Sequence, residues 1–160
     1  MAENANDAIL NLLGPVLKQV EPEKMPALVA VLERAVGAYY QSVASQSQDA
    51  KLRKLLRDSK ENEDANAATI ERLHDGAVEE GKKLLERFPE LMTLLDRAFA
   101  NLSPAQRLRA TAEAEKVGAD LYRQFAGGVG DNAAARADLL GCADRELKNA
   151  DAVQQASHYV

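Results

Sequence analysis

Polar residues interrupt an apolar row in the stretch LLRDSKENEDANAATIERL, which runs from Leu55 to Leu73. Apolar side chains at three- and four-residue spacing predict an amphipathic helix. Glu63 and Asn66 continue that row, and Ile70 resumes it. We therefore expect a carboxylate and an amide on the core-facing side of a helix, where each needs a hydrogen bond, a proton or a cation.

The same pattern occurs twice in the chain. Two Glu–Tyr pairs, each separated by seven residues, lie 82 residues apart: Glu33 with Tyr40, and Glu115 with Tyr122. Two Glu-x-x-Asn motifs lie 83 residues apart: Glu63 with Asn66, and Glu146 with Asn149. Because the two offsets differ by only one residue, they indicate an internal repeat that places the same polar groups inside both halves.

Helical periodicity covers most of the chain, so we expect an all-α protein that forms a single domain of 160 residues. Residues 1–25 are expected to contain an accessory helix, kinked or broken at Gly14-Pro15. Residues 26–74 and 104–156 each read as two helices joined by a short turn, which favours antiparallel neighbours. Residues 75–103 read as a long crossover with two short helices divided at Pro89. The expected architecture is an antiparallel four-helix bundle.

Cap signals place the helix ends in the second half. Ser103, Pro104 and Gln106 form a capping-box pattern, so a helix is predicted from Pro104 to about Phe125. The glycine-rich GGVGD segment reads as a turn, because no strand precedes it and no Gly-Lys-Ser/Thr follows it. Asp131 is the expected N-cap of a last helix that runs to Ala156.

Charge and cysteine content exclude several classes of function. The net charge of -5, with basic residues interspersed among acids, argues against a nucleic-acid partner. The single cysteine, Cys142, excludes Cys-x-x-Cys metal and redox motifs. The sequence shows neither a secretory leader nor a run of about 18 apolar residues, so we expect no membrane association and a cytoplasmic location.

The four repeated glutamates are expected at one level of the bundle. Glu33 and Glu63 are 30 residues apart, and Glu115 and Glu146 are 31 apart, so each pair lies on opposite arms at similar distances from its turn. Four carboxylates in a core cannot all stay ionised without compensation. Two divalent ions would neutralise their charge.

This arrangement resembles the ferritin-like superfamily of four-helix di-iron carboxylate proteins, in particular the rubrerythrin-type branch, over residues 26–74 and 104–156. The resemblance implies a dinuclear iron or manganese centre with ferroxidase or peroxidase-like redox activity. The metal ligands would come from Glu33, Glu63, Asn66, Glu115, Glu146 and Asn149, with Tyr40 and Tyr122 contacting the glutamates.

The chain departs from the family pattern at Asn66 and Asn149, where the family has histidine. Two roles are open for these amides: oxygen ligands to a hard cation, or hydrogen-bond donors to buried glutamates. The second role favours a metal-free bundle that acts as a structural or partner-binding protein. Apolar faces on the accessory and crossover helices suit a homodimer, a small homo-oligomer or a protein partner. A third interpretation is a small-molecule-binding bundle that uses the same polar centre.

Other candidate residues are given structural roles. The Glu71-x-x-His74 motif lies at a helix end with no matching glutamate in the other half, so His74 is expected near a helix C-terminus. His158 is expected at the surface, and Cys142 as a small core residue.

Overall fold

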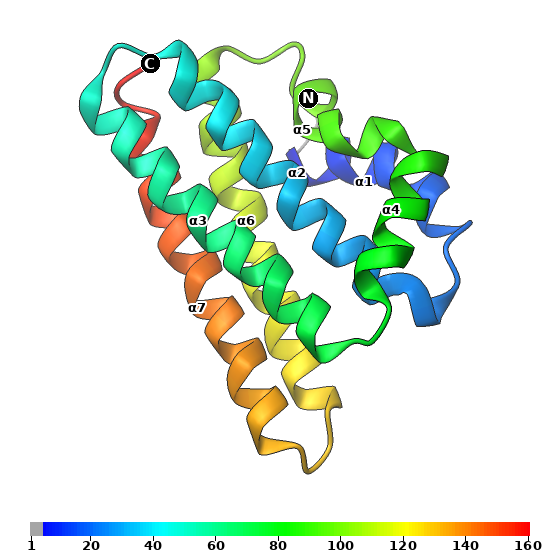
Figure 1. The fold of residues 1–160 in the computed structure, drawn as a ribbon. Coiled ribbons are helices and arrows are strands. Elements are labelled where there is room, and N and C mark those ends of the chain that lie inside the picture. The colour runs from blue at the N-terminus through cyan, green and yellow to red at the C-terminus, as the bar shows by residue number, and fades with distance from the viewer. Residues whose placement is uncertain (1–4) are drawn as a thin grey trace.

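The computed structural model describes residues 5–160, which form helices and contain no strand (Figure 1). The four long helices are α2 (Met25–Gln46), α3 (Ala50–Leu73), α6 (Pro104–Gly128) and α7 (Ala133–Ala156). The shorter helices are α1 (Ala5–Leu17), α4 (Ala77–Arg87) and α5 (Leu94–Ala98), with two 3₁₀ turns, η1 (Pro22–Lys24) and η2 (Pro89–Thr93). The expected all-α class is confirmed.

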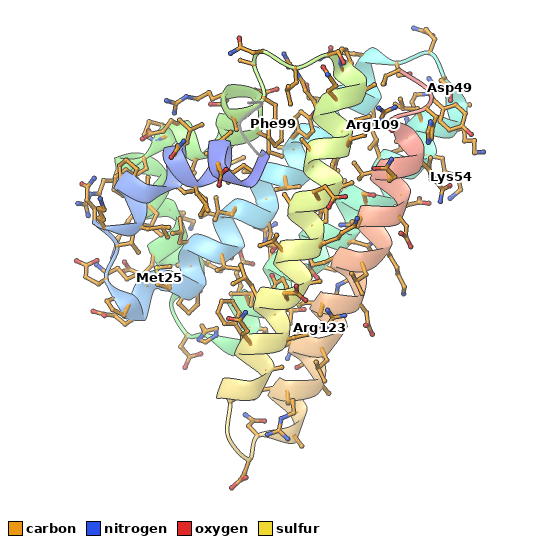
Figure 2. All side chains as sticks on the ribbon, turned by 180° about the vertical axis from the view of Figure 1, so that it is seen from behind. Met25, Asp49, Lys54, Phe99, Arg109 and Arg123 are labelled. Atoms are coloured by element: carbon orange, nitrogen blue, oxygen red, sulfur yellow. The ribbon has the colours of Figure 1, made fainter. Side chains whose placement is uncertain are left out.

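The long helices form two hairpins. α2 packs against α3, α6 packs against α7, and the hairpins meet where α3 lies beside α7 (Figure 1). On the other side, α1 packs against α5 and α6, as the view from behind shows (Figure 2). Thus α3 and α7 contact each other directly, whereas α1 and α5 cover the side where α2 faces α6.

The crossover between the hairpins is divided at Pro89, as predicted. α4 ends at Arg87 and η2 begins at Pro89. Phe88 between them has φ -131° and ψ 65°, because the ring of a following proline excludes the helical conformation from the residue before it. The predicted capping box is also present: Ser103 accepts from the Gln106 N–H, and the Gln106 side chain accepts from the Ser103 N–H.

The structure differs from the sequence prediction at two helix positions. Of the kink or break expected at Gly14-Pro15, the break does not occur, because α1 continues through both residues to Leu17. Pro15 lies near the end of α1, where the loss of its N–H donor removes a hydrogen bond only from the last turn. The N-cap of α7 is Asn132 rather than Asp131, and its side chain accepts from the Ala135 N–H at 3.0 Å. Asn and Asp cap equally well, so adjacent candidates cannot be ranked from the sequence.

Two apolar clusters fill the bundle on either side of a polar layer. One contains Leu52, Leu56, Leu108 and Val153, and the other contains Ile70, Ala119, Leu139 and Cys142. A third cluster lies between α1, α2 and α4. None of the helices in residues 5–160 has a stretch both long and apolar enough to span a lipid bilayer. The polar layer is therefore the feature of the core that calls for explanation.

Candidate metal centre

The layer contains the four repeated glutamates, one from each long helix. Glu33 comes from α2, Glu63 from α3, Glu115 from α6 and Glu146 from α7. Their exposed fractions are 9%, 1%, 4% and 4%, so all four are buried as the periodicity predicted. Glu33 takes the inward direction and its neighbour Leu32 is only partly buried.

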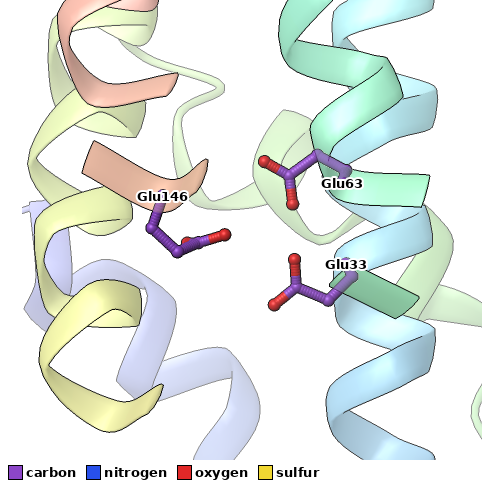
Figure 3. Close-up of side chains that lie close together, drawn as sticks. All are labelled: Glu33, Glu63 and Glu146. Carbon is purple, nitrogen blue, oxygen red and sulfur yellow. The ribbon is translucent and has the colours of Figure 1, made fainter. Parts of the chain in front are cut away.

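Three of these carboxylates converge on one point. Glu33, Glu63 and Glu146 each offer a carboxylate oxygen, and these oxygens lie within 4.8 Å of one another. Figure 3 shows the three carboxylates pointing toward each other from separate helices. Because oxygen ligands lie roughly 2.0–2.6 Å from a hard divalent cation, small side-chain shifts would bring all three into one coordination sphere.

The two repeated tyrosines join the halves reciprocally. Tyr40 of the first half donates its hydroxyl to Glu115 of the second half. Tyr122 of the second half donates to Glu33 of the first half at 2.7 Å. Burial and the nearby carboxylates raise the pKa of both phenols, so the tyrosines stay neutral and act as donors.

The two repeated asparagines make the same kind of exchange. The Asn66 Nδ2 donates to Glu146 Oε1 at 2.5 Å and to Glu33 Oε2 at 3.3 Å. The Asn149 Nδ2 donates to Glu63 Oε1 at 2.5 Å. Each glutamate therefore accepts a hydrogen bond from a tyrosine or asparagine of the opposite half.

The orientation of the Asn66 amide follows from its second partner. Arg145 Nε donates to Asn66 Oδ1 at 2.6 Å. Because a guanidinium has only donors, the amide must turn its oxygen to Arg145 and its nitrogen to the carboxylates. Asn66 is thus placed as a hydrogen-bond donor to the layer, which is the second of the two roles open from the sequence.

The Asn149 amide is oriented in the same sense by different groups. Its Nδ2 also donates to the backbone oxygen of Ser59 at 3.4 Å, and a carbonyl can only accept. Its Oδ1 accepts from Asn62 Nδ2 at 2.8 Å. Both amides therefore present nitrogen rather than oxygen to the carboxylates, so they do not fit the role of metal ligands in this arrangement.

Burial shifts the ionisation of the layer. It raises the pKa of Glu63 well above its ordinary value, and repulsion from Glu115 and Glu33 raises it further. Burial also raises the pKa of Glu146, with added repulsion from Glu33 and Glu115. The pKa of Glu115 rises to about 7, because burial outweighs the hydrogen bonds with Glu146 and Tyr40 that lower it. Burial without a cation therefore favours the protonated form of Glu63, Glu115 and Glu146.

Gly118 makes room for one of the carboxylates. A Cβ at this position of α6 would overlap Glu146 Oε2 and lie 3.2 Å from Glu146 Cδ. The contact to Oε2 would be closer than real Cβ atoms show, so the Glu146 carboxylate would have to move. The absence of a side chain at Gly118 therefore lets the carboxylate of α7 reach across to α6.

Arg145 and Asn62 support the polar layer, and the sequence reasoning missed both. Each comes directly before a repeated glutamate, and they are 83 residues apart, the offset of the Glu-x-x-Asn motifs. Each donates to the asparagine of the opposite half. Extending the repeat by one residue would have found this pair. It was missed because the two equivalent positions hold different residue types, a partly buried Asn and a partly buried Arg.

The remaining candidates lie away from the layer or support it. His74 is the C-cap residue of α3, as expected, and His158 is exposed. Cys142 is fully buried, and the Arg145 Nη2 donates to its Sγ at 3.2 Å. Burial raises the pKa of its thiol, so it is a neutral core group rather than a thiolate ligand.

Comparison with known proteins gives no match: no family model, no curated protein and no solved structure matches this chain.

Proposed function

We propose that this chain is a ferritin-like antiparallel four-helix bundle whose glutamates bind divalent metal ions, iron or manganese, in a dinuclear centre. The observation that carries the proposal is the convergence of Glu33, Glu63 and Glu146 in the core, with Glu115 completing the layer. Tyr40, Tyr122, Asn66 and Asn149 donate hydrogen bonds to these carboxylates, and their phenol and amide groups carry no positive charge. Two divalent ions would neutralise four carboxylates in place of protons.

The surrounding residues position the carboxylates for this task. Hydrogen bonds from Asn149, Tyr40 and Asn66 engage one oxygen, Oε1, of Glu63, Glu115 and Glu146 respectively. Such bonds fix the direction of each carboxylate and leave its other oxygen to turn toward a cation. Four carboxylates form an all-oxygen donor set, which suits hard divalent cations. When bound, iron or manganese would supply one-electron redox chemistry for ferrous oxidation or peroxide reduction.

Metal content tests the proposal directly. The protein is purified without chelator, loaded with Mn(II) or Fe(II), and analysed by plasma mass spectrometry. We expect about two ions per chain, and none in the Glu63→Gln/Glu146→Gln variant. The matched control is Glu61→Gln/Glu113→Gln, which removes two exposed carboxylates from α3 and α6. Equal metal content in the two double variants would place the ions elsewhere and contradict the proposal.

Restoring the family's histidines tests the ferritin-like assignment. Asn149→His would place an imidazole where the resemblance expects a ligand, and Asn66→His would do the same in the other half. We expect the double variant to bind Fe(II) more tightly than the parent. Asn149→His is made first, because Asn66→His also removes the acceptor of Arg145. Weaker binding in both variants would show that positions 66 and 149 do not face the metals.

A second candidate function is a metal-free bundle that acts through its surface. The amide orientation favours it, because each carboxylate already accepts a hydrogen bond from a neutral donor. A protonated layer satisfied in this way needs no cation. Absence of metal after both loadings, together with unchanged melting temperature on adding Mn(II), would support this function over the first.

A further inference from the structure

An apolar cavity leads from the surface to the carboxylate layer. It has a volume of about 410 Å³ and lies between α2 and α6, with α1 and α5 contributing to its wall. All four glutamates line it. Its other lining residues are mostly apolar and include Leu32, Val36, Leu95, Val117, Leu121 and Phe125.

The outer part of this cavity is an exposed apolar rim. Leu10 of α1 and Val117, Leu121 and Phe125 of α6 line the cavity, and their exposed fractions are 56%, 43%, 44% and 41%. The three α6 residues follow one another at four-residue spacing, so they share one face of that helix. Small-molecule sites typically have volumes of roughly 300–1,000 Å³, apolar walls and a few polar groups that orient the ligand. This cavity has all three properties.

We propose that the cavity binds a small molecule with an apolar body and one protonated amine, with the amine against the glutamates and the body between α2 and α6. The walls would bury the apolar body. An ammonium group has donors only and carries a positive charge, so it complements carboxylates that can accept. An anionic head group would meet like charges, and a hydroxyl would bring no compensating charge.

This site goes beyond the proposed metal centre. It shares the four glutamates with that centre and adds the apolar residues of α1, α2, α5 and α6, which are not among the proposed metal ligands. An ammonium ion and a divalent cation would compete for the same carboxylates. The amine site is therefore tested on protein freed of metal by chelator and dialysis.

Calorimetric titration with three eight-carbon probes tests the head group. We expect 1-octylamine to bind, 1-octanol to bind roughly tenfold more weakly, and octanoate to bind more weakly still. Glu33→Gln keeps the shape of the least buried glutamate and replaces its carboxylate with a neutral amide, so it should weaken octylamine more than octanol. Equal affinity for the amine and the alcohol, or no binding of octylamine, would overturn the proposal.

A pair of tryptophan variants tests the location. Leu121→Trp fills the rim of the cavity and should weaken octylamine binding at least about tenfold. Leu140→Trp is the matched control, since Leu140 is 43% exposed on α7 and is not a cavity residue. Circular dichroism melts establish that both variants fold. Equal loss of binding in both variants, or in neither, would overturn the assignment to this cavity.

The two proposals fail separately. Metal content of the Leu121→Trp variant should equal that of the parent, because the rim supplies no metal ligand. A parent protein that takes up no metal but binds octylamine would remove the metal centre and support the amine site. A parent protein that binds metal when loaded, but binds no octylamine after the metal is removed, would support the metal centre and overturn the amine site.

Discussion

The carboxylate layer has two unlike sides. On the α3–α7 side the helices contact each other, and Asn66 and Asn149 donate hydrogen bonds to the carboxylates. Arg145 and Asn62 in turn donate to the oxygens of these two amides. On the α2–α6 side an apolar cavity of about 410 Å³ reaches the same carboxylates. One side positions the acids and the other gives access to them. A purely structural polar layer would need the first side but not the second.

Proton uptake by the layer should give the largest effect. The folded pKa of Glu115 is about 7 against an ordinary value of 4.5, and the pKa values of Glu63 and Glu146 are also raised. A carboxyl whose pKa is raised in the folded state contributes stability that is fully present below its ordinary pKa. This contribution is lost as the pH rises through the folded-state pKa. Metal-free protein should therefore lose stability from acid to mildly alkaline pH.

Urea unfolding at about pH 5.5 and about pH 8 measures this loss, which should be roughly 1.4 kcal/mol per pH unit for each carboxyl that keeps its proton on folding. The Glu63→Gln/Glu146→Gln variant should show a smaller slope, because Gln keeps an acceptor for the amide donors without titrating. If the metal centre forms, Mn(II) should stabilise the parent more at the higher pH, since ligands must be deprotonated. A parent as stable at the higher pH as at the lower, without metal, would contradict the raised pKa values.

Removing an amide from the α3–α7 side should give the next largest effect. Asn66→Leu keeps the branching and the number of heavy atoms of the side chain but removes the donor to Glu146 and Glu33 and the acceptor of Arg145. We expect a loss of roughly 3 kcal/mol in the free energy of unfolding, because buried polar groups lose their partners. Gln124→Leu, at an exposed position of α6, should change stability by less than about 0.5 kcal/mol. Stabilisation by Asn66→Leu would mean that the amide does not satisfy the layer.

Two glycine substitutions compare the close approach of helices at the layer with an open position. Gly118→Ala would force Glu146 to move, and that carboxylate is held by Asn66, so we expect a loss of about 1–2 kcal/mol. Gly141→Ala on α7 would place its Cβ near Arg145 Nη1 only, at 3.8 Å. Ala favours a helix interior, so this control should gain up to about 1 kcal/mol. Thermal melts of both proteins measure the difference, and equal changes would show that Gly118 does not accommodate Glu146.

The helices and the inward glutamates were predictable because both depend on local periodicity. Leu52, Leu56 and Ile70 mark one face of α3, and Glu63 at the same spacing must share it. The internal repeat extended this inference to Glu33, where Leu32 offered a competing direction. The capping box at Ser103 was predictable for the same reason, since its partners lie three residues apart.

The amide orientations and the cavity could not be predicted in this way. Asn66 turns its nitrogen to the carboxylates because Arg145, 79 residues away, occupies its oxygen. Asn149 does so because Ser59 and Asn62 approach from α3. The cavity exists because α1 and α5 reach the α2–α6 side without filling it.

The amino-acid sequence by itself determined which residues face inward, because helical periodicity and the repeat act along the chain. Only the tertiary structure decided which atom of each amide faces the acids and which side of the layer stays open. Those choices depend on donors, acceptors and volumes that meet across helices, and such contacts leave no periodic trace in the sequence.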